Sequence, residues 1–167
     1  NLALQKGVTK ASFGDFEWNI VNVNDWNKDI EGVIWLRKAI EIAGAYKKQD
    51  LILHLGKPHG TAHVYFNESK IGEVTGPRSI ELKLPGELVK SGENQITLRL
   101  ASPRYKGFLS GEADQFFIAT TTGAKIADLS GEWKYNEKLE PELPPIQFYY
   151  RYPAALFNGM INPISTF

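Results

Sequence analysis

Alternation of hydrophobic and polar residues runs along much of the chain, and it predicts β-strands. In one segment Ile34, Leu36, Ile40 and Ile42 share a parity that only Lys38 interrupts. Because alternate side chains of a strand point to the same face, this period of two indicates one buried face. The same pattern recurs between turn residues and predicts about eight or nine strands. We expect strands at 18–23, 33–42, 51–55, 62–66, 71–74, 79–84, 95–100, 115–120 and 132–135.

The connections between these segments favour antiparallel sheets. Helix signals are sparse, and only 85–90 is expected to form a short helical turn within this region. Segments 62–66 and 71–74 flank the turn residues 67–70, which predicts a hairpin. Short strands with so little helix are typical of sandwiches and barrels rather than α/β folds. We therefore expect an all-β protein, an antiparallel β-sandwich of the jelly-roll type.

The pattern changes near Asn136. The segment 140–145 is rich in proline, which removes backbone donors and stiffens the chain, so it predicts a linker. Beyond it, 153–161 is expected to form a short helix that begins at a proline. This tail is also rich in aromatic and aliphatic residues, which indicates that it needs a partner surface. We expect a sandwich over 1–137, followed by the linker and tail over 138–167.

Composition supports a folded core and narrows the partners. Hydrophobic residues make up 43% of the chain and aromatic residues 12%, which is more than a disordered chain carries. Lys plus Arg equals Asp plus Glu, 19 each, and no basic stripe is visible, so we expect no nucleic acid partner. No apolar run is long enough to cross a bilayer, so we expect no membrane partner. The chain has no cysteine, and its start, without Met or a signal peptide, indicates a piece of something longer.

The sequence offers no complete catalytic group. A serine hydrolase needs a serine on a tight turn, a histidine as base and an acid to orient it. There is no Gly-x-Ser-x-Gly, and Phe16 stands where the Gly-Asp-Ser of lipase-like esterases has its nucleophile. The histidines are His54, His59 and His63, and the last two are separated by a glycine-containing loop that does not favour shared metal binding. We expect no catalytic residue, no metal and no cofactor.

Aromatic residues in loops are candidates for carbohydrate contact, because sugars stack their C–H faces on aromatic rings. Trp35 lies within an alternating strand, which favours core packing. Trp26 lies in a polar segment and is expected to be more open. The candidate carbohydrate-binding residues are Trp26, Arg78, Tyr105 and Phe108.

Several short motifs stand in order along the chain. They are Trp26 with Gly32 to Lys38, Leu53 to Gly56, Val64 to Asn67 with Ile71-Gly72, Gly92 to Arg99, and Leu129 to Tyr135. Together they resemble the galactose-binding-like jelly roll found in glycoside hydrolase family two and in sialate O-acetylesterases. A final motif at 153–163, PAALFNGMINP, is similar to one in the esterases. On these motifs the chain resembles the sandwich domain of a sialate O-acetylesterase.

This resemblance implies a galactose-binding-like sandwich inserted into an esterase of the SGNH-hydrolase type. The catalytic serine and histidine would lie before and after this chain, and 138–167 would re-enter the esterase domain. The chain would then be a non-catalytic accessory domain of an enzyme that removes 9-O-acetyl groups from sialic acids or related glycans. The implied partners are the esterase domain of the same polypeptide and a glycan, and the implied location is secreted or periplasmic.

The chain also differs from that family. The loop 57–63 contains no acid where an acidic loop is usual, and Glu68 follows Asn67 where glycine is usual. Carboxylates in such a loop bind sugar hydroxyls or brace the backbone, so their loss favours an accessory role over sugar binding. Two alternatives stay open: a carbohydrate-binding domain of a glycoside hydrolase family two enzyme, and a stand-alone structural module.

Overall fold

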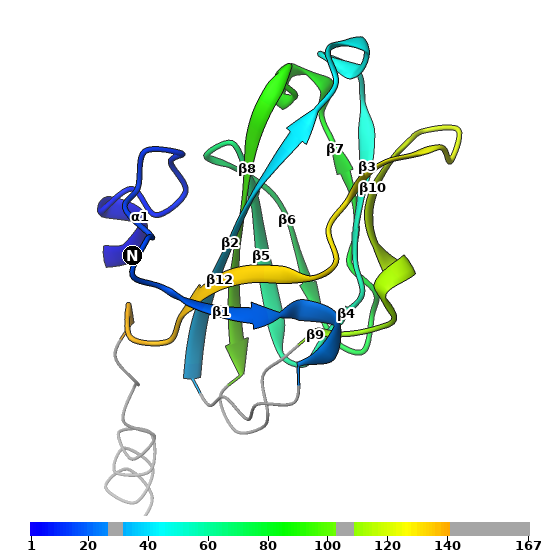
Figure 1. Cartoon of the computed structure of the whole chain (residues 1–167). Helices are drawn as coiled ribbons and strands as arrows, with labels where there is room; N and C mark the ends of the chain where they lie inside the picture. Colours follow the sequence, from blue (N-terminus) through cyan, green and yellow to red (C-terminus); the bar gives the residue numbers. More distant parts are fainter. Residues whose placement is uncertain (27–31, 103–108, 141–167) are drawn as a thin grey trace, which may run out of the picture.

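Two antiparallel β-sheets packed face to face form the protein (Figure 1). The computed structural model describes residues 1–26, 32–102 and 109–140. The strands in these ranges are β1 (Asn19–Asn22), β2 (Gly32–Ile42), β3 (Leu51–Leu55), β4 (Lys57–Pro58), β5 (Thr61–Phe66), β6 (Ser69–Thr75), β7 (Glu81–Leu84), β8 (Gly92–Ser102), β9 (Leu109–Ser110), β10 (Phe116–Thr120), β11 (Lys125–Asp128) and β12 (Glu132–Asn136). The predicted all-β antiparallel sandwich is confirmed.

The strands form one large sheet, one smaller sheet and a short ladder. The six-stranded sheet has the order β1-β12-β2-β8-β5-β6, and the four-stranded sheet has the order β11-β10-β3-β7. Strands β4 and β9 pair separately. Each predicted strand overlaps an observed one. The sequence pattern missed β4, β9 and β11, because strands of two to four residues are too short to show alternation.

Within residues 1–26, 32–102 and 109–140, helical structure is confined to short segments. These are α1 (Leu2–Gln5) and the 3-10 helices η1 (Val23–Asp25), η2 (Gly44–Tyr46), η3 (Gly86–Leu88) and η4 (Ala113–Gln115). The predicted turn at 85–90 contains η3 and is confirmed. The predicted helix at 153–161 lies outside the described residues. In the part of the chain that the structure describes, no helix is both long enough and apolar enough to cross a membrane.

The main core lies between the two large sheets. The apolar residues of β2 predicted to share one face all line it: Ile34, Leu36, Ile40 and Ile42. Lys38 has the same parity but lies at the core edge. Its ammonium donates to the carbonyl of Glu132 at 2.8 Å and lies 6.0 Å from the Trp133 ring centre. The one polar interruption of the pattern is therefore bound by a backbone carbonyl and an aromatic ring.

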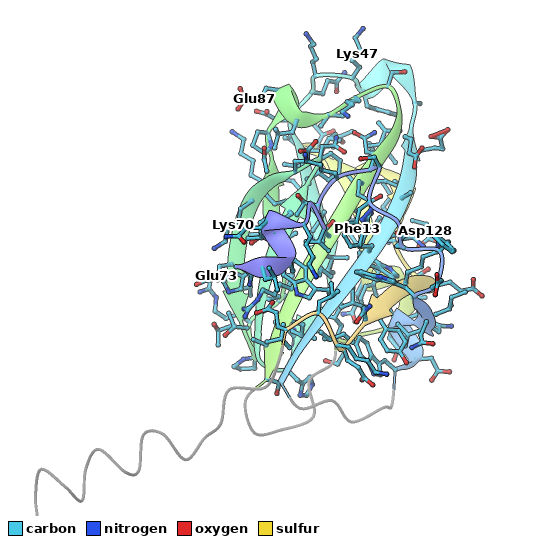
Figure 2. All side chains as sticks on the ribbon, turned by 90° about the vertical axis from the view of Figure 1, so that its left-hand side faces the viewer. Phe13, Lys47, Lys70, Glu73, Glu87 and Asp128 are labelled. Carbon is cyan, nitrogen blue, oxygen red and sulfur yellow. The ribbon has the colours of Figure 1, made fainter. Side chains whose placement is uncertain are left out.

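A second hydrophobic cluster lies on the outer face of the six-stranded sheet. Residues 1–18 cover part of this face, which is turned toward the viewer in Figure 2. Ala3 and Val8 of the covering segment pack there against Trp35 and Tyr65, whose rings stack with centroids 6.2 Å apart. Trp35 is fully buried, which confirms that it packs structurally, although it belongs to this second cluster rather than to the main core.

Arg37 ties the covering segment to the sheet. Its side chain is 1% exposed, and its two terminal nitrogens donate to the carbonyls of Val8 at 2.8 Å and Lys10 at 2.9 Å. Its Nε lies 3.1 Å from one carboxylate oxygen of Asp15, and the other carboxylate oxygen lies 3.0 Å from Lys134 Nζ. Burial lowers the pKa of Arg37, and the neighbouring Asp15 opposes that shift. The buried Arg37 side chain thus contacts three residues of the covering segment, Val8, Lys10 and Asp15.

The predicted hairpin of β5 and β6 is confirmed, and its turn has an unusual residue. Asn67 and Glu68 have φ angles of 46° and 75°, as in the type I′ turn that favours Asn-Gly. Asn67 is fixed by its side chain, which accepts from the Gln95 backbone at 2.8 Å and donates to Asn94 at 2.7 Å. Glu68 holds a left-handed conformation that side chains disfavour.

We expect the substitution Glu68→Gly to stabilise the protein by about 1 kcal/mol. Glycine removes a left-handed penalty of about 1–2 kcal/mol, and its greater freedom in the unfolded chain returns part of that gain. Urea unfolding of both proteins measures the difference. The matched control is Glu93→Gly in β8, which should destabilise because glycine weakens a strand. Equal losses for both variants would contradict the strain at Glu68.

Candidate functional site

The structure describes two of the four candidate residues. Tyr105 and Phe108 lie outside the described residues. Arg78 is exposed, next to Pro77 of the cis Gly76–Pro77 bond. Trp26 is only 7% exposed and packs in the main core, with its ring centre 6.2 Å from that of Tyr135. The expected openness of Trp26 is therefore wrong, and its contact with a carbohydrate stays a prediction.

A hollow of about 400 Å³ lies at the end of the sandwich where β4 and β9 pair, at the bottom of Figure 1. We call it the loop-end hollow. Its lining residues are Lys57, Pro58, His59, Gly60, Gly76, Pro77, Ser102 and Ser110. The predicted residue Arg78 follows Pro77 in the chain but is not among these lining residues. Sequence reasoning missed the hollow as a site, because it treated the acid-free loop 57–63 only as a loss of carboxylates.

Two glycines, Gly60 and Gly76, line the hollow where two backbone segments meet. The amide of Gly76 donates to the carbonyl of Gly60 at 2.9 Å, so the two backbones touch. A side-chain carbon on Gly76 would overlap the carbonyl oxygen of Pro58, and one on Gly60 would overlap that of Ala101. Gly60 also has a φ of 109°. The hollow therefore depends on backbone segments that only glycine allows to come this close.

The described lining of the hollow contains one lysine, one histidine and two serines. Lys57 and His59 are exposed, while Ser102 is buried and Ser110 is half-buried. Not one of the eight lining residues is acidic. Such a set donates hydrogen bonds and attracts negative charge, so it suits a polar ligand that carries acceptors.

A row of polar side chains crosses the outer face of the six-stranded sheet. The strand register places Glu73, His63, Arg99 and Trp35 side by side on four neighbouring strands. His63 Nε2 lies 3.2 Å from Glu73. Arg99 donates twice to the Glu140 carboxylate, at 2.8 and 2.9 Å, and Trp35 Nε1 donates to it at 2.8 Å. Arg99 and Trp35 thus hold the Glu140 carboxylate against the sheet. We call the four residues of this row, together with Glu140, the latch.

The contacts of the latch concern the C-terminal end of the sandwich. Contacts to the sheet continue as far as Glu140, and Leu139 packs against the second hydrophobic cluster. The predicted boundary at residue 137 stays a prediction, and the remainder of the tail, 141–167, lies outside the described residues. Figure 2 shows Lys70 and Glu73 together at the β6 edge of the same face, where their charged atoms are 3.2 Å apart.

We expect the latch to make stability depend on pH. Hydrogen bonds from Arg99 lower the pKa of Glu140 to about 2, with smaller contributions from Asn1 and Trp35. Because this pKa lies below the ordinary 4.5, the carboxylate stabilises the fold above about pH 4.5 and less as the pH falls toward 2. Solvent screening reduces the gain to about 1–2 kcal/mol.

Urea unfolding of the wild type and of Glu140→Gln checks this expectation. The variant should be less stable near neutral pH, and the two curves should converge below about pH 4.5. The exposed Glu93 offers a control, since Glu93→Gln should change stability little at either pH. A constant difference between wild type and Glu140→Gln across this range would show that the carboxylate charge contributes nothing.

The three histidines lie on different surfaces. His54 stacks on Phe117 with ring centres 4.2 Å apart, on the outer face of the four-stranded sheet. His63 pairs with Glu73 on the outer face of the other sheet, and His59 lines the loop-end hollow. Among the described residues, no group of three or more His, Asp or Glu side chains could hold a metal ion. The spacing of His59 and His63 reflects a loop followed by strand β5.

Comparisons with known proteins identify the fold. No protein-family model matches the chain, and no curated protein matches its sequence significantly. A Bacteroides uniformis β-glucuronidase matches at 17% identity and a TM-score of 0.50, over 77% of this chain and 15% of that protein. Bacteroides uniformis β-glucuronidase 2, bound to cyclophellitol-6-carboxylate aziridine, matches at 15% identity and a TM-score of 0.50, over 77% and 16%. A glycosyl hydrolase family 2 member from Bacteroides cellulosilyticus matches at 18% identity and a TM-score of 0.49, over 77% and 18%.

These comparisons correct the expected family. At such identities the similarity shows the fold alone, and the chain spans less than a fifth of each of these proteins. The two structures that match at a TM-score of 0.50 are β-glucuronidases and not esterases, so the assignment to sialate O-acetylesterases of the SGNH-hydrolase type is wrong. The motif that favoured the esterases, at 153–163, lies outside the described residues. The other motifs mark strands and turns of the sandwich.

Proposed function

We propose that this chain is a non-catalytic, carbohydrate-binding accessory domain of a glycoside hydrolase of the family two type. One observation carries the proposal: the sandwich matches two β-glucuronidases over 77% of this chain but only 15–16% of their lengths. A small β-sandwich of this kind is a part of a larger glycosidase rather than the whole of it. Because a fold alone does not give a function, the proposal also needs a site, and the loop-end hollow supplies one.

The chemistry of the hollow supports binding rather than cleavage. Glycoside hydrolysis generally needs two carboxyl groups on opposite sides of the scissile bond. Among the described residues that line the loop-end hollow there is no carboxyl group, and the polar side chains are those of Lys57, His59, Ser102 and Ser110. A saccharide held there would find hydrogen-bond donors and no acid or base pair of the usual kind.

Binding and turnover assays on the 167-residue chain test the proposal. We expect a glycan array followed by calorimetry to give saturable binding of at least one saccharide. We also expect no release of chromophore from aryl glycosides. Absence of binding across the array would favour the structural-module alternative and overturn the proposal. Turnover that a single substitution abolishes would overturn it as well.

The gene that encodes the chain offers a second test. A glycoside hydrolase catalytic domain should be encoded in the same polypeptide. A catalytic domain of any other class would contradict the proposed partner, whatever the chain itself binds.

A further inference from the structure

Strand β1 lies at one edge of the six-stranded sheet and carries no charged residue. Sheet edges present unpaired backbone groups, and proteins commonly protect them with charged side chains. The other three edge strands of the two large sheets follow this rule, because β6, β7 and β11 each contain one lysine and one acidic residue. Among the described residues, β1 pairs only with β12. Of these four edges, β1 is therefore the one best suited to accept another strand.

Exposed apolar side chains lie in and just before β1. Among the described residues, the two most exposed large hydrophobic side chains are Phe16 at 79% and Ile20 at 60%. The register pairs Ile20 with Lys134 and Lys134 with Arg37, so Ile20 lies on the outer face of the sheet. The edge thus offers an added strand both backbone hydrogen bonds and an apolar side-chain contact.

The latch places the end of the described chain on the same face. Arg99 of β8 and Trp35 of β2 both donate to the Glu140 carboxylate. A strand added to β1 would lie three strand spacings from β2 and four from β8, which is about 15–20 Å. The proline-rich segment 141–145 covers about 20 Å between residues 140 and 146 when it is extended. Residue 146 can therefore reach the free edge of β1.

The sequence that follows this linker has the pattern of a strand. Residues 146–152 read IQFYYRY, with Ile146, Phe148, Tyr150 and Tyr152 on one parity and Gln147, Tyr149 and Arg151 on the other. Aromatic and β-branched residues with a period of two favour a strand that has one apolar face. Prolines at 145 and 153 bound the pattern. The segment is longer than β1, which has four residues.

We propose that residues 146–152 add a strand to the free edge of β1 and pack apolar side chains against Ile20. Pairing covers the unpaired backbone groups of β1 and removes apolar surface of both partners from water. Because the two partners belong to one chain, the effective concentration of the segment at the edge is on the order of millimolar. This inference does not depend on the proposed carbohydrate binding.

A second copy of the chain fits this edge less well. Between two copies, β1 offers only four residues for pairing. Stable protein interfaces generally bury about 1,200 Å² or more, which so short a ladder does not supply. A tethered segment of the same chain does not need an interface of that size.

Hydrogen–deuterium exchange on the 167-residue chain tests the proposal. We expect amides in 146–152 to exchange about tenfold or more slowly than in an unstructured chain, and this protection to persist on dilution. Exchange of 146–152 at the unstructured rate would overturn the proposal. Protection that is lost on dilution would overturn it as well, because another copy would then supply the partner strand.

Variants on both sides of the contact locate the partner. Ile20→Lys places a charge beside the edge, and Phe148→Asp places one in the segment, so each should speed exchange of 146–152 about tenfold. The controls are Leu4→Lys, at an exposed apolar residue of α1, and Phe157→Asp, further along the tail. Both controls should exchange as the wild type does.

Peptides from β2 and β8 report whether each variant keeps the sandwich folded, since these strands form the longest ladder. They should stay protected in Ile20→Lys, because the replaced side chain is exposed. Phe148→Asp tests the contact without any change in the sandwich. If both variants keep the protection of 146–152, the segment does not bind at β1 and the proposal is wrong.

Discussion

The substitution Arg37→Met is expected to lower the free energy of unfolding by about 3 kcal/mol. Methionine keeps much of the aliphatic volume but removes the donors to the carbonyls of Val8 and Lys10 and the ion pair with Asp15. Removing one member of a buried charged group usually costs about 3–5 kcal/mol, because its partners lose their compensation. The expected loss lies at the lower end, since Asp15 keeps its contact with Lys134.

Unfolding in urea measures the loss, and limited proteolysis locates it. The covering segment 1–18 should become sensitive to protease in Arg37→Met, because its main attachment to the sheet is gone. The matched control is Lys134→Met, which removes the other cation beside Asp15. That lysine side chain is 41% exposed, so its loss should cost about 0.5 kcal/mol. Equal effects of the two variants would show that Arg37 does not anchor the segment.

The covering segment also shows where a hydrophobic pattern stops being informative. The alternation in β2 correctly predicts the face that packs on the second sheet. It gives no sign that the opposite face is also covered, by a segment that has no alternation of its own. Trp35 and Arg37 both lie on that opposite face, and their partners are distant in sequence, such as Glu140 and Asp15. Long-range polar contacts of this kind leave no periodic signal in the chain.

The wrong expectation that Trp26 is exposed has a local physical explanation. Its polar neighbours suggested an open loop, but those neighbours satisfy backbone groups instead. Asn22 accepts from the backbone of Asn24 at 3.2 Å, and Asn24 accepts from that of Gly131 at 2.7 Å. Short polar side chains commonly cap turns in this way, so polarity around an aromatic residue does not establish exposure. Trp26 fills the core behind the capped turn.

The family resemblance predicted the fold well and the enzyme class wrongly, for a structural reason. Its motif residues have architectural roles that any enzyme with this sandwich would need. Trp133 is buried and donates to the carbonyl of Leu129 at 2.8 Å, while Gly131 between them has a φ of 82°. Asn67 fixes the β5–β6 turn. Such residues specify strands and turns, and they carry no information on the reaction that the rest of the polypeptide performs.

The second large effect is expected for Gly60→Ala, with a loss of about 3 kcal/mol. Part of this loss, about 1 kcal/mol, comes from alanine at a φ of 109°. The rest comes from overlap of the new methyl group with the carbonyl oxygen of Ala101, which can be relieved only by moving backbone. Gly123→Ala is the matched control, because Gly123 has a φ of 99° and nothing within 4 Å of a side-chain carbon. Its loss should be about 1 kcal/mol.

The difference between these two alanine variants isolates the close approach of the backbones at the hollow. Urea unfolding of both should show about 2 kcal/mol between them, and equal losses would mean that the loop beside Gly60 yields freely. Calorimetry then relates this packing to the proposed saccharide binding. Because the amide of Gly76 donates to the Gly60 carbonyl, moving Gly60 should also move Gly76, and both residues line the hollow. Gly60→Ala should therefore weaken saccharide binding even under conditions where it is fully folded, whereas Gly123→Ala should bind as the wild type does.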